Sequence, residues 1–122
     1  MVGAGSDTLI AGFVVAGSQP LRLIIRASGP GLTPFGLTGA LARPQLNLLS
    51  GKVVVAQNTG WSTSSDAPAI TQAARQVGLF SFQSGSQDSA VIATLAPGGY
   101  TAQVTSADSA TGIALIEIYE LP

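Results

Sequence analysis

The sequence contains no cysteine and no histidine, and only 9% of its 122 residues are charged. The chain therefore lacks thiol nucleophiles, the commonest general base, and the side chains that usually bind zinc, haem and iron–sulfur clusters. Its five basic residues are scattered and its net charge is −1, so it also lacks the basic cluster that binds nucleic-acid phosphates. This composition predicts a protein that is not an enzyme, holds no metal or cofactor and binds no nucleic acid.

Long apolar runs are missing as well. The longest one has the length of a strand, whereas a membrane span needs about 20 residues. The first residues, Met1–Asp7, lack the basic and apolar regions of a signal peptide. A chain of 122 residues can bury a core without disulfides, so we predict a single domain over residues 1–122. Both ends of the sequence indicate a module excised from a longer multidomain chain.

What the sequence does have is alternation of apolar and polar residues in β-branched runs, which is typical of strands. Turn residues separate these runs, as at Ser50-Gly51, and Gly29-Pro30-Gly31 ends one of them because proline removes a backbone donor. Residues 32–44 carry further prolines and glycines and are predicted to be irregular. The predicted strands cover residues 8–15, 21–26, 45–49, 52–56, 89–95, 100–105 and 111–119.

One segment has helical spacing instead. Asp66 or a preceding serine can cap it, and Gly78 supplies its end. Its apolar residues follow the i, i+3, i+4, i+7 pattern at Ile70, Ala73, Ala74 and Val77. The predicted fold class is therefore all-β, an antiparallel β-sandwich or jelly-roll with one short helix over residues 67–77.

The last predicted strand is apolar on both faces, with Ile116 and Ile118 on one side and Ile113 and Leu115 on the other. Two interpretations fit this pattern. The strand is central and covered by the helix or a loop, or its second face meets another domain.

Blocks along nearly the whole chain resemble a repeat module of very large secreted bacterial proteins. These blocks are residues 8–15, 23–32, 85–90, 95–104 and 112–120. The second half is also similar to bacterial pre-peptidase C-terminal domains, with Pro97-Gly98-Gly99-Tyr100 leading into the final strands. The resemblance implies a non-catalytic β-sandwich of a secreted or cell-surface bacterial protein. Related repeats often read Asn-Asp-x-Trp after the fourth strand. Here Asn58-Thr59-Gly60-Trp61 lacks the acidic residue that a calcium role would need.

Arg26 is the charged residue that stands out, because it precedes the Gly29-Pro30-Gly31 break in a chain with few charges. We predict a structural role for Arg26, Gly29, Pro30 and Glu117, in which the guanidinium donates to loop carbonyls or pairs with Glu117. Ligand binding by Arg26 is the alternative.

The candidate ligand-binding residues are Trp61 and Asn58, in a polar loop. A tryptophan there can stack on a sugar ring, or it can fold back as a lid on the core. No pattern carries catalysis, since no Gly-x-Ser-x-Gly motif occurs. Asp88, between Ser86 and Ser89, is interpreted as a local turn residue.

These observations predict a non-catalytic structural or interaction module that packs against neighbouring modules or copies of itself. With one lysine in total, its sheet edges lack the usual charged protection against such pairing. The alternative is a carbohydrate-binding module with Trp61 as stacking platform and a polysaccharide as partner.

Overall fold

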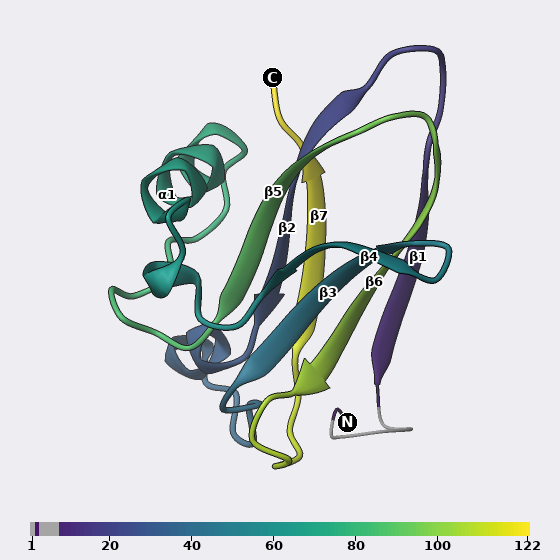
Figure 1. The fold of residues 1–122 in the computed structure, drawn as a ribbon. Coiled ribbons are helices and arrows are strands. Elements are labelled where there is room, and N and C mark those ends of the chain that lie inside the picture. Colours follow the sequence, from purple (N-terminus) through teal and green to yellow (C-terminus); the bar gives the residue numbers. More distant parts are fainter. Residues whose placement is uncertain (1, 3–7) are drawn as a thin grey trace.

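The computed structural model describes residue 2 and residues 8–122 of the chain. Its strands form two antiparallel sheets, one in the order β1-β6-β3-β4 and one in the order β5-β2-β7 (Figure 1). This confirms the predicted all-β sandwich with one short helix. The strands are β1 (Leu9–Val15), β2 (Leu21–Ser28), β3 (Pro44–Ser50), β4 (Val53–Asn58), β5 (Ser89–Leu95), β6 (Gly98–Ser106) and β7 (Leu115–Glu120).

The main core lies between the two sheets. Alternation in β2 turns Leu23, Ile25 and Ala27 inward, and all three are buried. They meet the inward residues of the opposite sheet, which include Leu46, Leu48, Ala102 and Val104. Burial of these aliphatic side chains supplies the main hydrophobic stabilisation of the fold.

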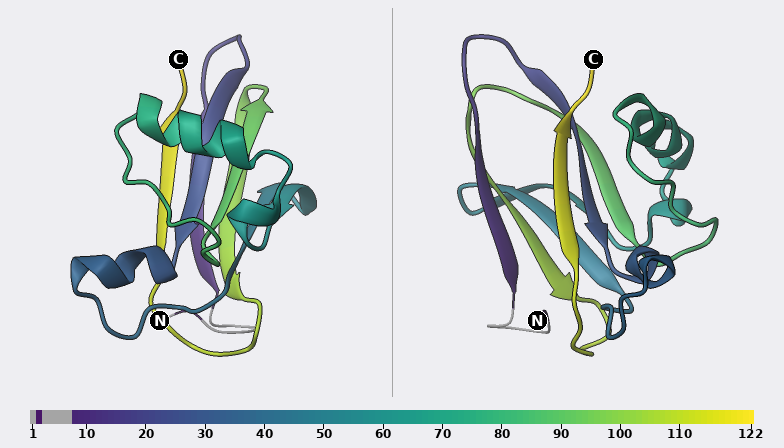
Figure 2. Two further views of the ribbon diagram at one scale, coloured as in Figure 1. Left: turned by 90° about the vertical axis from the view of Figure 1, so that its left-hand side faces the viewer. Right: turned by 180° about the vertical axis from the view of Figure 1, so that it is seen from behind.

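A second, smaller core lies on the outer face of the β5-β2-β7 sheet. Helix α1 (Ala67–Gln76) and the loop after it cover this face (Figure 2). Ile24 of β2 is fully buried there against Ile70 and Ala73 of the helix. The outer face of the β1-β6-β3-β4 sheet has no described helix on it (Figure 1).

Helix α1 begins at residue 67 as predicted, whereas its C-terminal end differs by one residue. Asp66 makes no side-chain capping bond. Ser64 acts instead, since its hydroxyl accepts from the N–H of Asp66 and its carbonyl accepts from the N–H of Ala67, both at 3.1 Å. The helix ends at Gln76, one residue early, because Gly78 takes a left-handed φ of 76°.

The last strand also differs from the prediction. β7 begins at Leu115 rather than at residue 111, because Gly112 and Ile113 form isolated bridges to Val2 and Ala40. The interpretation of this strand as central is wrong, since β7 lies at the edge of its sheet. The central place belongs to β2, whose two faces are covered by the two cores.

Candidate functional site

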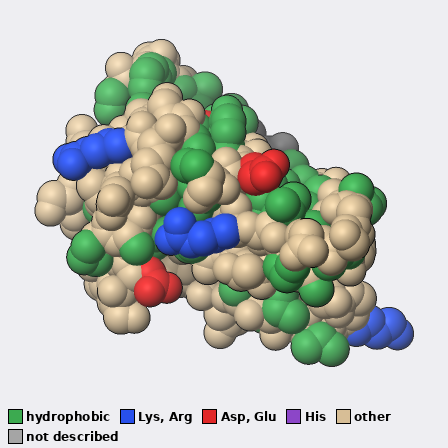
Figure 3. Space-filling model, turned by 90° about the horizontal axis from the view of Figure 1, so that it is seen from above, with side chains coloured by type: hydrophobic (Ala, Val, Ile, Leu, Met, Phe, Trp, Pro, Cys, Tyr) green, Lys and Arg blue, Asp and Glu red, His purple; other side chains and the backbone are tan. Residues whose placement is uncertain are grey.

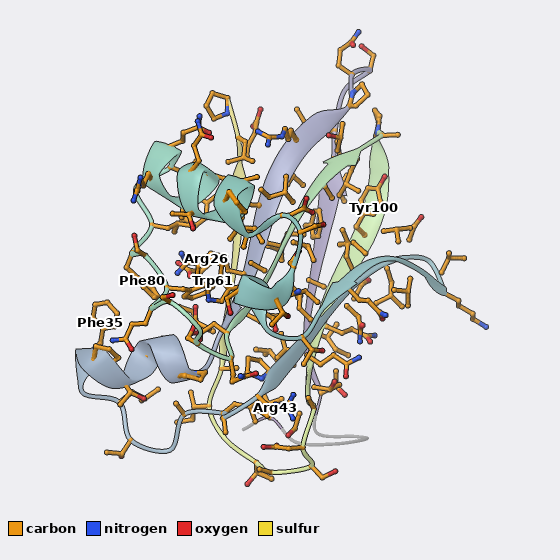
Figure 4. The ribbon with its side chains drawn as sticks, turned by 60° about the vertical axis from the view of Figure 1, so that its left-hand side comes forward. Arg26, Phe35, Arg43, Trp61, Phe80 and Tyr100 are labelled. Atoms are coloured by element: carbon orange, nitrogen blue, oxygen red, sulfur yellow. The ribbon has the colours of Figure 1, made fainter. Side chains whose placement is uncertain are left out.

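Arg26 points from β2 to the outer face of its sheet, under the loop that follows α1. Its side chain is only 1% exposed, and its guanidinium carbon lies 4.3 Å from the ring centre of Phe80 and 4.0 Å from that of Phe82. Figure 4 shows Arg26, Phe80 and Trp61 together below the helix. The guanidinium also donates from Nη1 to the carbonyl of Phe80 at 2.5 Å. Arg26 therefore holds this loop by cation–π contact and by a hydrogen bond.

Glu117 lies directly opposite Arg26 in the β2–β7 ladder, and its Oε1 is 3.3 Å from Nη2 of Arg26. Burial lowers the pKa of Arg26, while the negative charges of Glu117 and Asp88 oppose that change. An arginine in a protein nevertheless keeps its proton. The site thus contains a permanent buried cation with carboxylates around it.

Asp88 is the second charged residue inside this region, and it is fully buried. Its Oδ1 accepts from the backbone N–H groups of Gly29 at 2.7 Å and Gly31 at 2.9 Å, and its Oδ2 accepts from the Ser86 hydroxyl at 2.7 Å. Asp88 therefore bonds to distant backbone groups as well as to the nearby Ser86, and the prediction that it bonds only within a local turn is wrong. At Gly29-Pro30-Gly31 the strand β2 ends, and the backbone N–H groups there need a hydrogen-bond acceptor. The carboxylate of Asp88, far along the sequence, is that acceptor.

Gly29 allows this arrangement because the chain passes very close to it. A Cβ atom at Gly29 would lie 2.1 Å from the carbonyl oxygen of Leu41. Pro30 then begins a short 3-10 helix, η1 (Pro30–Phe35), which overlaps the start of the segment 32–44 that was predicted to be irregular. The predicted structural residues Arg26, Gly29 and Pro30 are thus brought to one end of β2.

Trp61 and Asn58 both face into the protein. Trp61 lies on η2 (Trp61–Thr63), is 8% exposed and donates from Nε1 to the Ser86 hydroxyl at 3.0 Å. The side-chain oxygen of Asn58 accepts from the N–H of Ala90 at 3.1 Å, so it ties the end of β4 to β5. The Trp61 ring therefore covers the second core and presents no open stacking face.

A cavity of about 10 Å³ lies between Arg26, Trp61 and α1, with Thr71 and Phe82 in its wall. This volume is near the lower limit for one water molecule. The charged cluster is consequently a packing centre with no space for a larger ligand. Within residue 2 and residues 8–122, no group of three acidic side chains is placed to hold a metal ion. In the same residues, no helix is long and apolar enough to cross a membrane.

One open part of the molecule is the β4 edge of the four-stranded sheet. β4 pairs with β3 and has no described strand on its other side. Its first three residues, Val53, Val54 and Val55, are 64%, 49% and 47% exposed. The strand contains no charged residue, and Lys52 precedes it in the hairpin turn. β4 therefore presents unpaired backbone groups beside exposed apolar side chains.

A groove of about 420 Å³ runs beside this edge, between β4 and β5. Its apolar wall includes Val55 and Ala56 from β4, Ile92 and Leu95 from β5, and Tyr100 from β6. Seen from above, the charged side chains of the molecule stand apart from one another among apolar and neutral ones (Figure 3). Among the described residues, no charged side chain lines the groove between β4 and β5.

Comparison with protein-family models, with curated proteins and with solved structures finds no match to this chain. The function of the chain must therefore be inferred from its own geometry. In that geometry the β4 edge is open to a partner, whereas Arg26 is buried.

Proposed function

We propose that this chain is a non-catalytic structural or interaction module that packs against neighbouring modules or copies of itself through its open sheet edges. The observation that carries the proposal is β4, an uncharged edge strand with three consecutive exposed valines. Natural proteins usually protect such edges with lysine, proline or a covering segment. β4 has a β-bulge at Val55 but no charged residue and no proline, so its edge is still a template for strand addition, and a module that functions by packing makes use of it.

The other edges support the same function. β1 is also an edge strand, with Ile10 59% and Val14 74% exposed. β7 exposes Leu115 and Tyr119 at the opposite sheet. A module with open edges on both sheets can contact neighbours on more than one side, as a bead in a tandem array must. The resemblance to repeats of secreted bacterial proteins supports this setting and a secreted or cell-surface location.

The carbohydrate-binding alternative has less support. It depends on Trp61 as a stacking platform, and that ring is 8% exposed and hydrogen-bonded to Ser86. Asn58, the other candidate, is bonded to backbone groups of Ala90 and Gly60. No described feature of this loop favours a sugar over the packing that occupies it.

Sedimentation equilibrium over a concentration series tests the proposal. The weight-average mass should rise above that of the monomer as the concentration increases. A monomer mass maintained up to about millimolar protein, well above the concentration that weak specific contacts require, would contradict self-association. A parallel titration of Trp fluorescence with soluble polysaccharides should give no shift, and a saturable shift would favour the carbohydrate-binding alternative.

A further inference from the structure

β2 carries two arginines on the outer face of its sheet, and their surroundings differ. Arg26 is buried and lies beside Glu117, whereas Arg22, near the start of the strand, is exposed. The neighbours of Arg22 across the sheet are Thr94 of β5 and Leu121, and neither is charged. Among the described residues, no side chain forms an ion pair or a hydrogen bond with the Arg22 guanidinium. Arg22 is therefore a cation without a partner in its own chain's described part.

A pocket of about 90 Å³ lies between Arg22 and α1, which crosses the outer face of this sheet near the end of β7 (Figure 2). Its helical wall is one face of α1, formed by residues at the spacing i, i+3, i+4 and i+7. These residues are Ala69, Gln72, Ala73 and Gln76. The volume is several times the about 10–15 Å³ that one water needs, and far below the roughly 300–1,000 Å³ of pockets for larger ligands. The pocket therefore has the size for one small polar group.

The groups that line this pocket select a carboxylate. The guanidinium of Arg22 presents its N–H donors in a planar fork, which matches the two oxygens of a carboxylate. The side-chain amides of Gln72 and Gln76 form no hydrogen bond with another described residue, so their NH₂ groups can donate to the same ligand. Of the described residues that line the pocket, only Arg22 is charged. Its single positive charge is balanced by a monoanion, whereas a sulfate or phosphate dianion would keep a negative charge.

We infer that this pocket binds the carboxylate of an aspartate or glutamate on a neighbouring module; this inference rests on the proposed function. An ion pair at an exposed site contributes little by itself, so a free carboxylic acid binds here only weakly. A carboxylate on a partner that already packs against the module is held next to Arg22, so its binding is effectively intramolecular. Arg22 would also repel a partner with a basic residue at that place. The pocket thus adds specificity to contacts that uncharged sheet edges make.

An NMR titration of the Arg22 side chain tests the inference, with sodium acetate as the probe and sodium chloride to keep the ionic strength constant. Arg75 is the matched control, because it is an exposed arginine of α1 that does not line the pocket. The Nε–H signal of Arg22 and the side-chain amide signals of Gln72 and Gln76 should shift together. Acetate should bind at Arg22 about threefold or more tightly than at Arg75, because several charge-assisted hydrogen bonds converge there. Acetamide, the uncharged analogue, should cause no such shifts, and equal responses of the two arginines to acetate would overturn the inference.

Two variants separate carboxylate binding from a purely structural role of Arg22. Arg22→Lys keeps the charge but loses the planar fork, and Arg22→Gln removes the charge. The acetate-induced shifts of the Gln72 and Gln76 amides should be smaller in the first variant and absent in the second, while thermal unfolding verifies that both variants fold. If Arg22 only stabilises the negative C-terminal end of α1, Arg22→Gln lowers stability and leaves these shifts unchanged, which would overturn the inference.

A pair of blocked peptides tests the source of the carboxylate. The peptide acetyl-Ala-Glu-Ala-amide should reproduce the shifts that acetate causes, and acetyl-Ala-Gln-Ala-amide should not. Binding of acetate without binding of the glutamate peptide would overturn the assignment to a protein side chain. The titration observes Arg22 directly and does not require the chain to associate. A protein that stays monomeric therefore contradicts the proposed self-association alone, and an Arg22 signal that does not respond contradicts the inference alone.

Discussion

At the scale of single residues, the few buried charges of this protein hold one end of β2 in place. Arg26 and Asp88 are buried at one end of β2, and Glu117 faces Arg26 from the neighbouring strand. The removal of one member of such a cluster leaves a buried charge or donor without a partner, which costs several kcal/mol. The cluster therefore holds two segments in a single conformation, namely the loop after α1 and the Gly29-Pro30-Gly31 segment after β2.

Gly29→Ala should lower the free energy of unfolding by about 1–3 kcal/mol, the usual range for overpacking. The new Cβ would lie 2.1 Å from the carbonyl oxygen of Leu41, so the backbone must move and weaken the Gly29–Asp88 hydrogen bond. Urea unfolding measures the change. Gly99→Ala is the control, because no atom lies within 4 Å of a Cβ built there. Equal stability of the two variants would contradict the close approach.

Asp108 should titrate below its ordinary pKa of 3.8. The Ser106 hydroxyl donates to its carboxylate at 2.8 Å and the N–H of Ala110 donates at 3.1 Å, and these bonds lower the pKa. The unfolded chain then binds more protons, so this contribution to stability is present above pH 3.8 and is lost as pH falls through the folded-state pKa. NMR titration of the Asp108 carboxyl carbon checks the direction. Ser106→Ala should return the pKa toward 3.8, and an unchanged pKa in that variant would exclude the hydroxyl as the main cause.

At the scale of elements, α1 is a cover for the β5-β2-β7 sheet. A helix of ten residues is marginal alone, so it depends on the apolar stripe that it buries. Ile70 and Ala73 of that stripe pack with Ile24, while Trp61 and Phe82 close the loop side of the same cluster. The helix and the two segments that flank it therefore form one layer with the sheet.

Ile70→Ala should reduce the free energy of unfolding by about 2–5 kcal/mol, as do other large-to-small changes in cores. The side chain is 2% exposed and borders the small cavity next to Arg26, so the substitution enlarges that cavity. Chemical denaturation followed by Trp61 fluorescence measures it. Gln76→Ala, at an exposed position of the same helix, should change stability little. If both variants unfold alike, α1 is not part of the cooperative fold.

At the scale of the whole molecule, the sandwich buries its inner faces and leaves edges open. β4 is the edge where free backbone groups, exposed valines and a groove occur together. Antiparallel sheets that are not closed into a barrel keep such edges, and their protection depends on the residues placed there. In this chain the residues of the β4 edge are uncharged, and its first three valines are exposed.

The midpoint of thermal unfolding should consequently rise with protein concentration. Under the proposed self-association, the folded assembly and the unfolded monomer are linked by mass action, so a hundredfold increase in concentration should raise the midpoint by several degrees. Differential scanning calorimetry at both concentrations measures the shift. In Val54→Lys the shift should vanish. A wild-type midpoint independent of concentration would contradict the proposed self-association.

Local patterns were enough to predict the strands, the helix and the sandwich class. The period-2 alternation of residues 100–105 and the helical spacing from Ile70 to Val77 reflect side-chain geometry within one segment. The same reasoning identified the break at Gly29-Pro30-Gly31, because proline and glycine restrict or free the backbone wherever they occur. The boundaries of several elements differ by one or more residues between the prediction and the structure. These differences occur where caps and bridges depend on other parts of the chain.

Only the tertiary structure decided which strand is central, which edges are open and where the charged residues lie. Asp88 accepts a hydrogen bond from Gly29, which lies 59 positions earlier in the sequence. Trp61 points inward because its ring packs against Phe82 and its Nε1 donates to the Ser86 hydroxyl. Residues 113–118 include apolar side chains on both faces, yet β7 lies at an edge because β2 separates it from β5. The sequence by itself determined each segment's conformation, which depends on neighbours along the chain. Pairing order and burial depend on distant contacts, and these exist only once the sheets have assembled.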